Sequence, residues 1–201
     1  VTDDIEVVNL AESGNYAEGL YNSPFKGVIA NGQAGDYLLL ECGYNDKNYS
    51  TQAKMTTAVQ NMIDECRAKG IIPILVTPNA SAHDFNNSVV WSSVLVSIAK
   101  EKGTFLVDLS KLSYEYLKNK GVDWAKMNTN IYYDGASQDT LHASYLGAYI
   151  WAETVMQNIA DQQAAGAKDS QGKTLDGIHI NKNFVKTLTD AEGNPITLQV
   201  Q

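Results

Sequence analysis

A carboxylate and an imidazole close to the last predicted helix are the first residues whose types and spacing suggest chemistry. Asp139 and His142 stand three residues apart, directly before a segment with helical periodicity. A carboxylate beside an imidazole fixes the tautomer of the ring and stabilises the cation that forms when the ring accepts a proton. The pair could therefore act as a general base with its orienting acid. The same spacing is common in helix caps and turns, and Ser144 could cap the helix that follows.

Two loops that contain glycine could supply hydrogen-bond donors for the same chemistry. Residues 43–46 read Gly-Tyr-Asn-Asp and follow a continuous apolar run. The side-chain amide of Asn45 and a backbone N–H at Gly14 could point at one oxygen, which is what the oxyanion of acyl transfer requires. The alternative is a turn in which Asn45 and Asp46 only satisfy nearby backbone groups.

The composition limits the classes of partner. The chain has 201 residues, of which 15 are Lys or Arg and 23 are Asp or Glu, and it shows no basic run. A nucleic-acid partner or an anionic membrane surface is therefore not expected. The apolar runs are too short to span a membrane. Cys42 and Cys66 lie in apolar patterns and are expected to be buried free thiols. No Cys/His spacing indicates a metal site, and no cofactor is implied.

The elements that must position these loops alternate between strands and helices. Short β-branched or apolar runs predict strands at residues 5–9, 37–42, 71–77 and 104–107. Helical periodicity predicts helices at residues 52–69, 91–102 and 144–160, with a short helix that Ser110 caps and Gly121 ends. This alternation predicts a three-layer αβα sandwich with a parallel, flavodoxin-like sheet, whose sites form at the carboxyl ends of the strands.

The pattern changes near the end of the chain. Residues 162–173 are small and polar, and a turn-like segment separates two apolar runs at 184–188 and 196–200. We therefore expect a main domain over residues 1–163, followed over residues 164–201 by a polar linker and a possible β-hairpin tail.

In this order and spacing, the loops resemble the conserved blocks of SGNH (GDSL-type) hydrolases over about residues 5–160. The run from Val7 to Gly14 and the segments 34–37, 43–46 and 76–78 are most similar to the rhamnogalacturonan acetylesterase branch. The resemblance implies a backbone oxyanion donor at Gly14 and a side-chain donor at Asn45. It also implies that His142 is the general base and that Asp139 orients it.

One block of that family is not found. The family's first strand ends in Gly-Asp-Ser, and the eight residues before Asn9 hold no serine. We expect the nucleophilic serine upstream, with the first strand missing between residues 5–9 and 37–42. Ser13 is the nearest candidate, but in the family pattern it adjoins the oxyanion glycine. Alternatively, residues 196–200 fill the slot, and direct pairing of 5–9 with 37–42 would contradict a missing strand.

The resemblance leads to an expected function with open alternatives. The main hypothesis is a serine esterase that deacetylates a plant cell-wall polysaccharide through an acyl-enzyme. The alternatives are an SGNH lipase or thioesterase, and a non-catalytic module that binds carbohydrate or a protein partner. The substrate class favours an extracellular or cell-surface location, although no targeting signal is visible. Without the serine, the activity of this chain by itself is in question.

Overall fold

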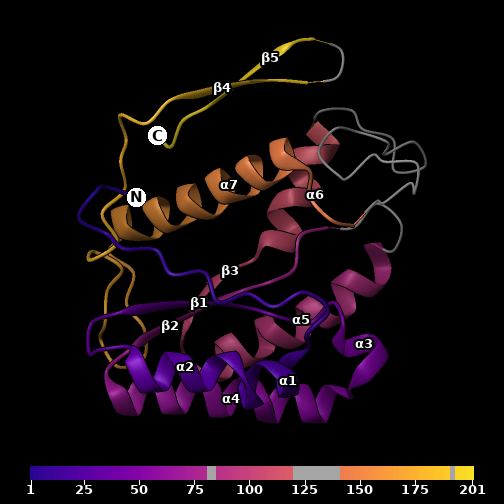
Figure 1. Ribbon diagram of the computed structural model, residues 1–201, viewed down its shortest axis with the longest axis vertical. Coiled ribbons are helices and arrows are strands. Elements are labelled where there is room, and N and C mark those ends of the chain that lie inside the picture. The colour runs from indigo at the N-terminus through magenta and orange to yellow at the C-terminus, as the bar shows by residue number, and fades with distance from the viewer. Residues whose placement is uncertain (81–84, 120–140, 191–192) are drawn as a thin grey trace.

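A parallel sheet forms the centre of the structure (Figure 1). The computed structural model describes residues 1–80, 85–119, 141–190 and 193–201, and for residues 85–90 it describes the backbone alone. Within these ranges the sheet has three strands in the order β1-β2-β3, and both pairings are parallel. The strands are β1 (Tyr37–Glu41), β2 (Ile72–Val76) and β3 (Phe105–Val107).

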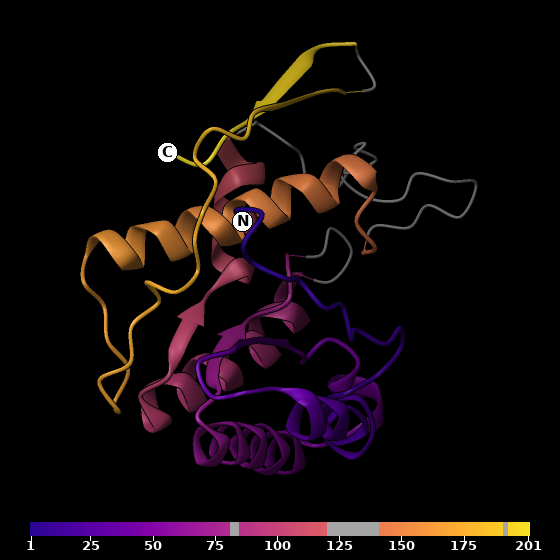
Figure 2. The ribbon, with the colours of Figure 1, turned by 60° about the vertical axis from the view of Figure 1, so that its left-hand side comes forward.

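Helices cover both faces of the sheet, as Figures 1 and 2 show. One face carries α1 (Ala17–Asn22), α2 (Pro24–Asn31), α4 (Gln52–Lys69) and α5 (Phe85–Lys102). The other carries α6 (Leu109–Asn119) and α7 (Tyr145–Ala164), while the short α3 (Asp46–Tyr49) follows β1. The predicted three-layer αβα sandwich is therefore confirmed. None of the described helices is long and apolar enough to cross a membrane.

The strand patterns follow from this layering. All five residues of β2 are buried because the strand has a neighbour on each side and a helical layer on each face. Ile74 and Val76 enter the cluster under α7, whereas Leu75 enters the cluster under α4 and α5. A strand covered on both faces is apolar throughout, which is why its sequence shows no alternation.

The helix α4 has the predicted bounds. Thr51 accepts a hydrogen bond from the backbone N–H of Lys54 at 3.3 Å, and Gly70 ends the helix in the left-handed conformation, with φ +81°. Cys66 on α4 and Cys42 after β1 are buried free thiols, as predicted. Burial raises the pKa of the Cys66 thiol to about 12 and raises that of Cys42 as well.

Two helix starts differ from the predictions. The helix expected over residues 91–102 begins at Phe85, six residues earlier. The cap of α6 is Asp108, whose carboxylate accepts a hydrogen bond from the N–H of Lys111 at 3.3 Å. Ser110 lies inside the first turn, so its prediction as the cap was wrong. Its N–H donates instead to the hydroxyl of Thr77 at 2.8 Å, which ties the carboxyl ends of β2 and β3 together.

The predicted strand at residues 5–9 is not formed. This segment has no regular secondary structure, and Val7 and Val8 expose 73% and 65% of their surface. A strand requires a partner for its backbone donors and acceptors, and among the described residues none pairs with this segment. Its apolar composition is local, whereas strand formation depends on a neighbour. The segment also does not pair with β1, and such pairing would have contradicted a missing strand.

The C-terminal segment first runs past the end of the sheet and then forms a hairpin on the outer side of α7 (Figure 2). The antiparallel strands β4 (Lys186–Thr189) and β5 (Pro195–Leu198) confirm the predicted hairpin. Because β5 pairs with β4 and Leu198 belongs to the core cluster that includes α7, the alternative in which residues 196–200 fill a slot beside β1 is wrong. The segment expected to be a polar linker contributes Leu175 and Ile178 to the same core cluster.

Candidate active site

The loops singled out in the sequence lie at the carboxyl end of the sheet. In Figure 1 the loop after β1 and the short α3 lie on the right, and α7 begins at the same end of the molecule. Carboxyl ends of parallel strands are where ligand sites form in open α/β sheets. The fold thus places at one end of the sheet loops that are about one hundred residues apart in the chain.

The two predicted oxyanion donors lie in contacting loops. The side-chain amide of Asn45 donates a hydrogen bond to the backbone carbonyl of Asn15 at 3.0 Å, and Gly14 is the residue before it. Gly14 has φ +72° in an exposed turn. A primary amide carries two N–H donors, so one can hold the Asn45 side chain in place while the other bonds a substrate oxygen. This arrangement suits a two-donor oxyanion site.

Asp46 holds these loops at a fixed distance. Its carboxylate is fully buried and accepts hydrogen bonds from the N–H of Ala17 at 3.1 Å and the N–H of Gly43 at 2.9 Å. Burial raises the pKa of Asp46, and the two backbone donors only partly oppose this shift. The sequence gives Asp46 only the alternative role of satisfying nearby backbone groups, which the bond from Gly43 fits and the bond from Ala17 does not. The bond to Ala17 spans 29 positions, so no local pattern could have revealed it.

Gly43 allows the chain to turn from β1 into the site. Its φ is +113°, a region that residues with a side chain rarely adopt. A Cβ here would lie 3.3 Å from Cε of Met55 and 3.7 Å from Cβ of Trp91. Glycine is thus required both for the turn and for the close packing against α4 and α5.

The candidate general base lies at the start of α7. His142 is exposed and precedes the first residue of the helix by three positions. Ser144 caps the helix, as expected, because its hydroxyl accepts a hydrogen bond from the N–H of Gly147 at 3.1 Å. Asp139, the predicted orienting carboxylate, lies outside the described residues. Ser13 is exposed in the turn before Gly14.

One side of β1 has no neighbouring strand among the described residues. Leu39 exposes 44% of its surface, although it is the middle residue of this apolar strand. Glu41 also keeps accessible surface, yet the surrounding protein desolvates its carboxyl and raises its pKa to about 7. Val7 and Leu10 of the N-terminal segment are exposed as well. An apolar sheet edge of this kind is suited to pairing with a further strand.

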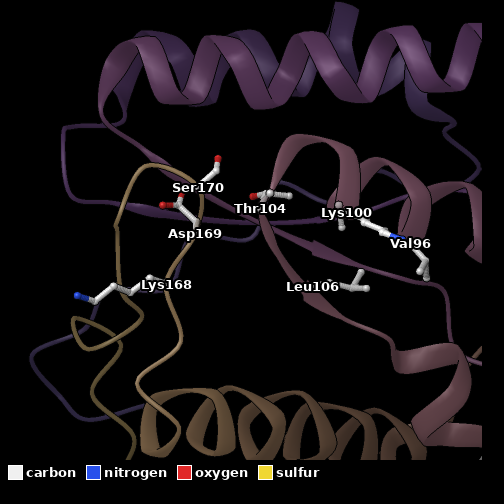
Figure 3. A pocket seen from close by; sticks show the side chains of 9 residues that line it. Val96, Lys100, Thr104, Leu106, Lys168, Asp169 and Ser170 are labelled. Carbon is white, nitrogen blue, oxygen red and sulfur yellow. The ribbon is translucent and has the colours of Figure 1, made fainter.

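A separate pocket lies at the opposite end of the sheet. Figure 3 shows the pocket between the loop after α7, with Asp169 and Ser170, and the segment with Thr104 and Leu106, while the side chain of Lys168 points away. Thr104 directly precedes β3, so this pocket lies at the amino ends of the strands. The residues that could do acyl-transfer chemistry do not line it.

The chain is similar to an esterase of Bacillus subtilis. It is 32% identical over 172 residues to the protein named uncharacterized esterase YxiM, and the match covers 80% of this chain and 44% of YxiM. The crystal structure of YxiM superposes with a TM-score of 0.69 at 29% identity, covering 81% of this chain and 47% of that one. The chain thus spans less than half the length of this relative.

Other solved structures share the fold at lower identity. An acetyl xylan esterase, AlAXEase, gives a TM-score of 0.61 at 18% identity and covers 73% of this chain and 77% of its own. A lipolytic protein of the G-D-S-L family from Veillonella parvula gives 0.59 at 14% identity, covering 78% and 81%. No family model matches the sequence. The relationship to YxiM and the parallel αβα sheet shared with these structures show that the chain has the fold of the SGNH, or GDSL-type, hydrolases.

Proposed function

We propose that the protein is a carboxylic ester hydrolase that works through a serine acyl-enzyme. The observation that carries this proposal is the Asn45 amide, which is held by the carbonyl of Asn15 beside Gly14 at the carboxyl end of the sheet. An amide in this position is suited to an oxyanion. The esterase name of the relative YxiM and the place of His142 at the start of α7 support it.

The proposed chemistry assigns a role to each of these groups. His142 accepts the proton of a serine hydroxyl while the serine oxygen attacks the ester carbonyl, and it later donates that proton to the leaving alcohol. Asp139 orients the imidazole. The N–H of Gly14 and the amide of Asn45 bond the negative oxygen that forms in between, and each such donor contributes roughly 3 kcal/mol to lowering the barrier. Water then hydrolyses the acyl-enzyme by the same route.

We further propose that the nucleophilic serine lies on a strand that pairs with the free edge of β1. The exposed side chain of Leu39 and the unpaired apolar segment with Val7 and Val8 support this position. A strand placed between them would bond the open backbone groups of β1 and cover this apolar surface. Its carboxyl end would then lie beside the Asn45 loop.

For the substrate, we propose acetyl groups on a neutral plant cell-wall polysaccharide such as xylan. Structural neighbours that carry the name acetylxylan esterase support this class. The net charge of −8 also favours a neutral polysaccharide over an anionic one, because like charges repel. A polymer of this size is reached outside the cell, so we propose an extracellular or cell-surface location.

Hydrolysis by the full-length protein tests the proposal. Acetate release from acetylated xylan and from triacetin is expected, and His142→Ala is expected to reduce kcat by roughly 10⁴-fold. The matched control is His179→Ala, since His179 pairs with Asp4 at 2.6 Å at the other end of the chain. Absence of turnover on both esters, or equal activity of His142→Ala and wild type, would overturn the esterase. Preference for long-chain esters would favour a lipase instead.

A further inference from the structure

Two tyrosines at the start of α7 form an aromatic cluster with a lysine of the hairpin. The rings of Tyr145 and Tyr149 have centroids 5.0 Å apart in an edge-to-face arrangement, and the hydroxyl of Tyr145 donates to that of Tyr149 at 3.3 Å. The ammonium of Lys186 on β4 lies 4.9 Å from the Tyr149 centroid and 6.0 Å from the Tyr145 centroid. Cation–π contacts at these distances are attractive.

The electrostatics of the cluster agree with this geometry. The hydrogen bond from Tyr145, together with the nearby Lys186 ammonium, lowers the pKa of Tyr149. The same hydrogen bond raises the pKa of Tyr145, and the two phenols raise that of Lys186. These directions are the ones expected for a phenol that donates a hydrogen bond, a phenol that accepts it and a cation beside both rings.

Packing in the core does not explain the exposed position of Tyr145. Tyr145 exposes 67% of its surface, although an aromatic ring in a helix usually turns toward apolar neighbours. The core-facing side of α7 is provided by Leu146 and Ile150. Tyr149 is half-buried against the same core cluster, whereas Tyr145 lies outside it. Two residues of the same kind, four positions apart, share one helix face. The exposed ring is thus presented to solvent and supported from behind.

The position of the cluster relates it to the candidate site. Tyr145 follows His142 by three residues and is the first residue of α7. It therefore lies at the carboxyl end of the sheet, at the edge of the loop that carries the proposed base (Figure 1). A polymer whose acetyl group reaches His142 would extend past this position over neighbouring sugar units.

We infer that Tyr145, supported by Tyr149 and Lys186, is a stacking platform for a sugar ring of the polysaccharide next to the acetylated unit. This inference rests on the proposed function. The pyranose ring of a neutral polysaccharide has an apolar C–H face that packs on an exposed aromatic ring. Its hydroxyls accept hydrogen bonds from the phenols and from the ammonium at the rim of the platform.

Binding of an unacetylated oligosaccharide tests the platform without requiring turnover. Xylohexaose is titrated into the protein by calorimetry, with xylose as the short probe. Tyr145→Ala is expected to weaken xylohexaose binding by roughly 10-fold, because an aromatic contact is lost, whereas Tyr145→Phe keeps the ring and stays within about 3-fold of wild type. Phe184→Ala is the matched control, an exposed aromatic of the C-terminal segment, and is expected to leave affinity unchanged.

Several results would overturn the platform. They are equal affinity of wild type and Tyr145→Ala, absence of xylohexaose binding by wild type, and a loss in Tyr145→Phe as large as in Tyr145→Ala. Nuclear Overhauser contacts between the Tyr145 ring and sugar C–H protons provide a second measurement on the wild type, and their absence would also overturn it.

Catalysis separates this inference from the proposed function. Triacetin has no ring to stack, so Tyr145→Ala is expected to hydrolyse it at the wild-type rate while losing activity on acetylated xylan. A parallel loss on triacetin would assign Tyr145 to the support of the His142 loop and overturn the platform. If wild type hydrolyses neither ester but binds xylohexaose through Tyr145, the esterase fails and the binding site stands.

Discussion

Asn45 and Asp46 show how adjacent polar residues can take different roles. The Asp46 carboxylate is buried and accepts two backbone N–H groups, whereas the Asn45 amide is half-buried and keeps a second donor beyond the bond to Asn15. Burial of a charge requires such donors, because an unpaired carboxylate is costly away from water. Asp46 thus sets the position of the loop, and Asn45 is the residue suited to a substrate.

The first residue-scale prediction concerns Asn45. Asn45→Ala in the full-length protein is expected to lower kcat for triacetin roughly 10²–10³-fold with little change in KM, since the lost bond forms in the transition state. Asn48→Ala, on the exposed side of α3, is the matched control and should retain wild-type kcat. A kcat within twofold of wild type for Asn45→Ala would show that its amide is only structural.

The raised pKa of Glu41 makes the stability of the fold depend on pH. Its pKa is raised from 4.5 to about 7 by desolvation, so the folded state holds this proton more tightly than the unfolded chain. The contribution of the protonated Glu41 carboxyl to the free energy of unfolding is complete below pH 4.5 and is lost as the pH rises through 7. The Tm advantage of Glu41→Gln over wild type is therefore expected to grow between pH 4.5 and 8. Glu115→Gln, exposed on α6, should show no such trend, and a pH-independent difference at Glu41 would contradict the shift.

Among the elements, the loop between β1 and α3 depends most on backbone geometry. Gly43→Ala is expected to destabilise the fold by about 1–2 kcal/mol, because φ +113° is unfavourable for alanine and its Cβ approaches Met55. Gly27→Ala, in α2 with open space around it, should instead stabilise by up to about 1 kcal/mol. Urea unfolding measures both, and equal effects of the two changes would contradict the strain argument.

Elements whose ends are set by local sequence signals could be predicted, whereas those that depend on distant contacts could not. The bounds of α4 were predicted correctly because Thr51, Gly70 and an apolar face are all local signals. The predicted strand at residues 5–9 was wrong because an apolar pattern indicates only that a segment tends to be buried. A strand also requires a partner, and no described strand pairs with this segment. In the candidate site, Asn45 was found from its loop, whereas its contact with Asn15 spans 30 positions.

A buried ion pair, Arg67 with Asp169, joins distant parts of the chain. Arg67 on α4 donates to the carbonyls of Lys102 and Gly103 and lies 3.6 Å from Asp169 in the loop after α7. The Asp169 carboxylate is nearly inaccessible to solvent. The pair attaches the C-terminal segment to the end of the sheet that lies away from the candidate site.

Breaking the pair between Arg67 and Asp169 is expected to cause a large loss of stability. Arg67→Ala is expected to cost about 3–5 kcal/mol because it leaves the Asp169 charge buried without its partner. Lys102→Ala, which removes a pair with the exposed Asp64 at 2.7 Å, should cost less than about 1 kcal/mol. Urea unfolding of both variants is the measurement. A loss for Arg67→Ala no larger than that for Lys102→Ala would contradict a structural role for the buried pair.

The sequence by itself determined the fold class, the main helices and the loops that carry the candidate catalytic residues. These features are local, because periodicity, caps and turn residues act over short distances. Only the tertiary structure decided which loops meet, that β1 is an open edge among the described strands, and that Leu175, Ile178 and Leu198 join the core cluster of α7. These features depend on contacts between residues far apart in the chain, such as Asp46 with Ala17 and Arg67 with Asp169. Such contacts arise from the packing of the sheet and leave no trace in local pattern.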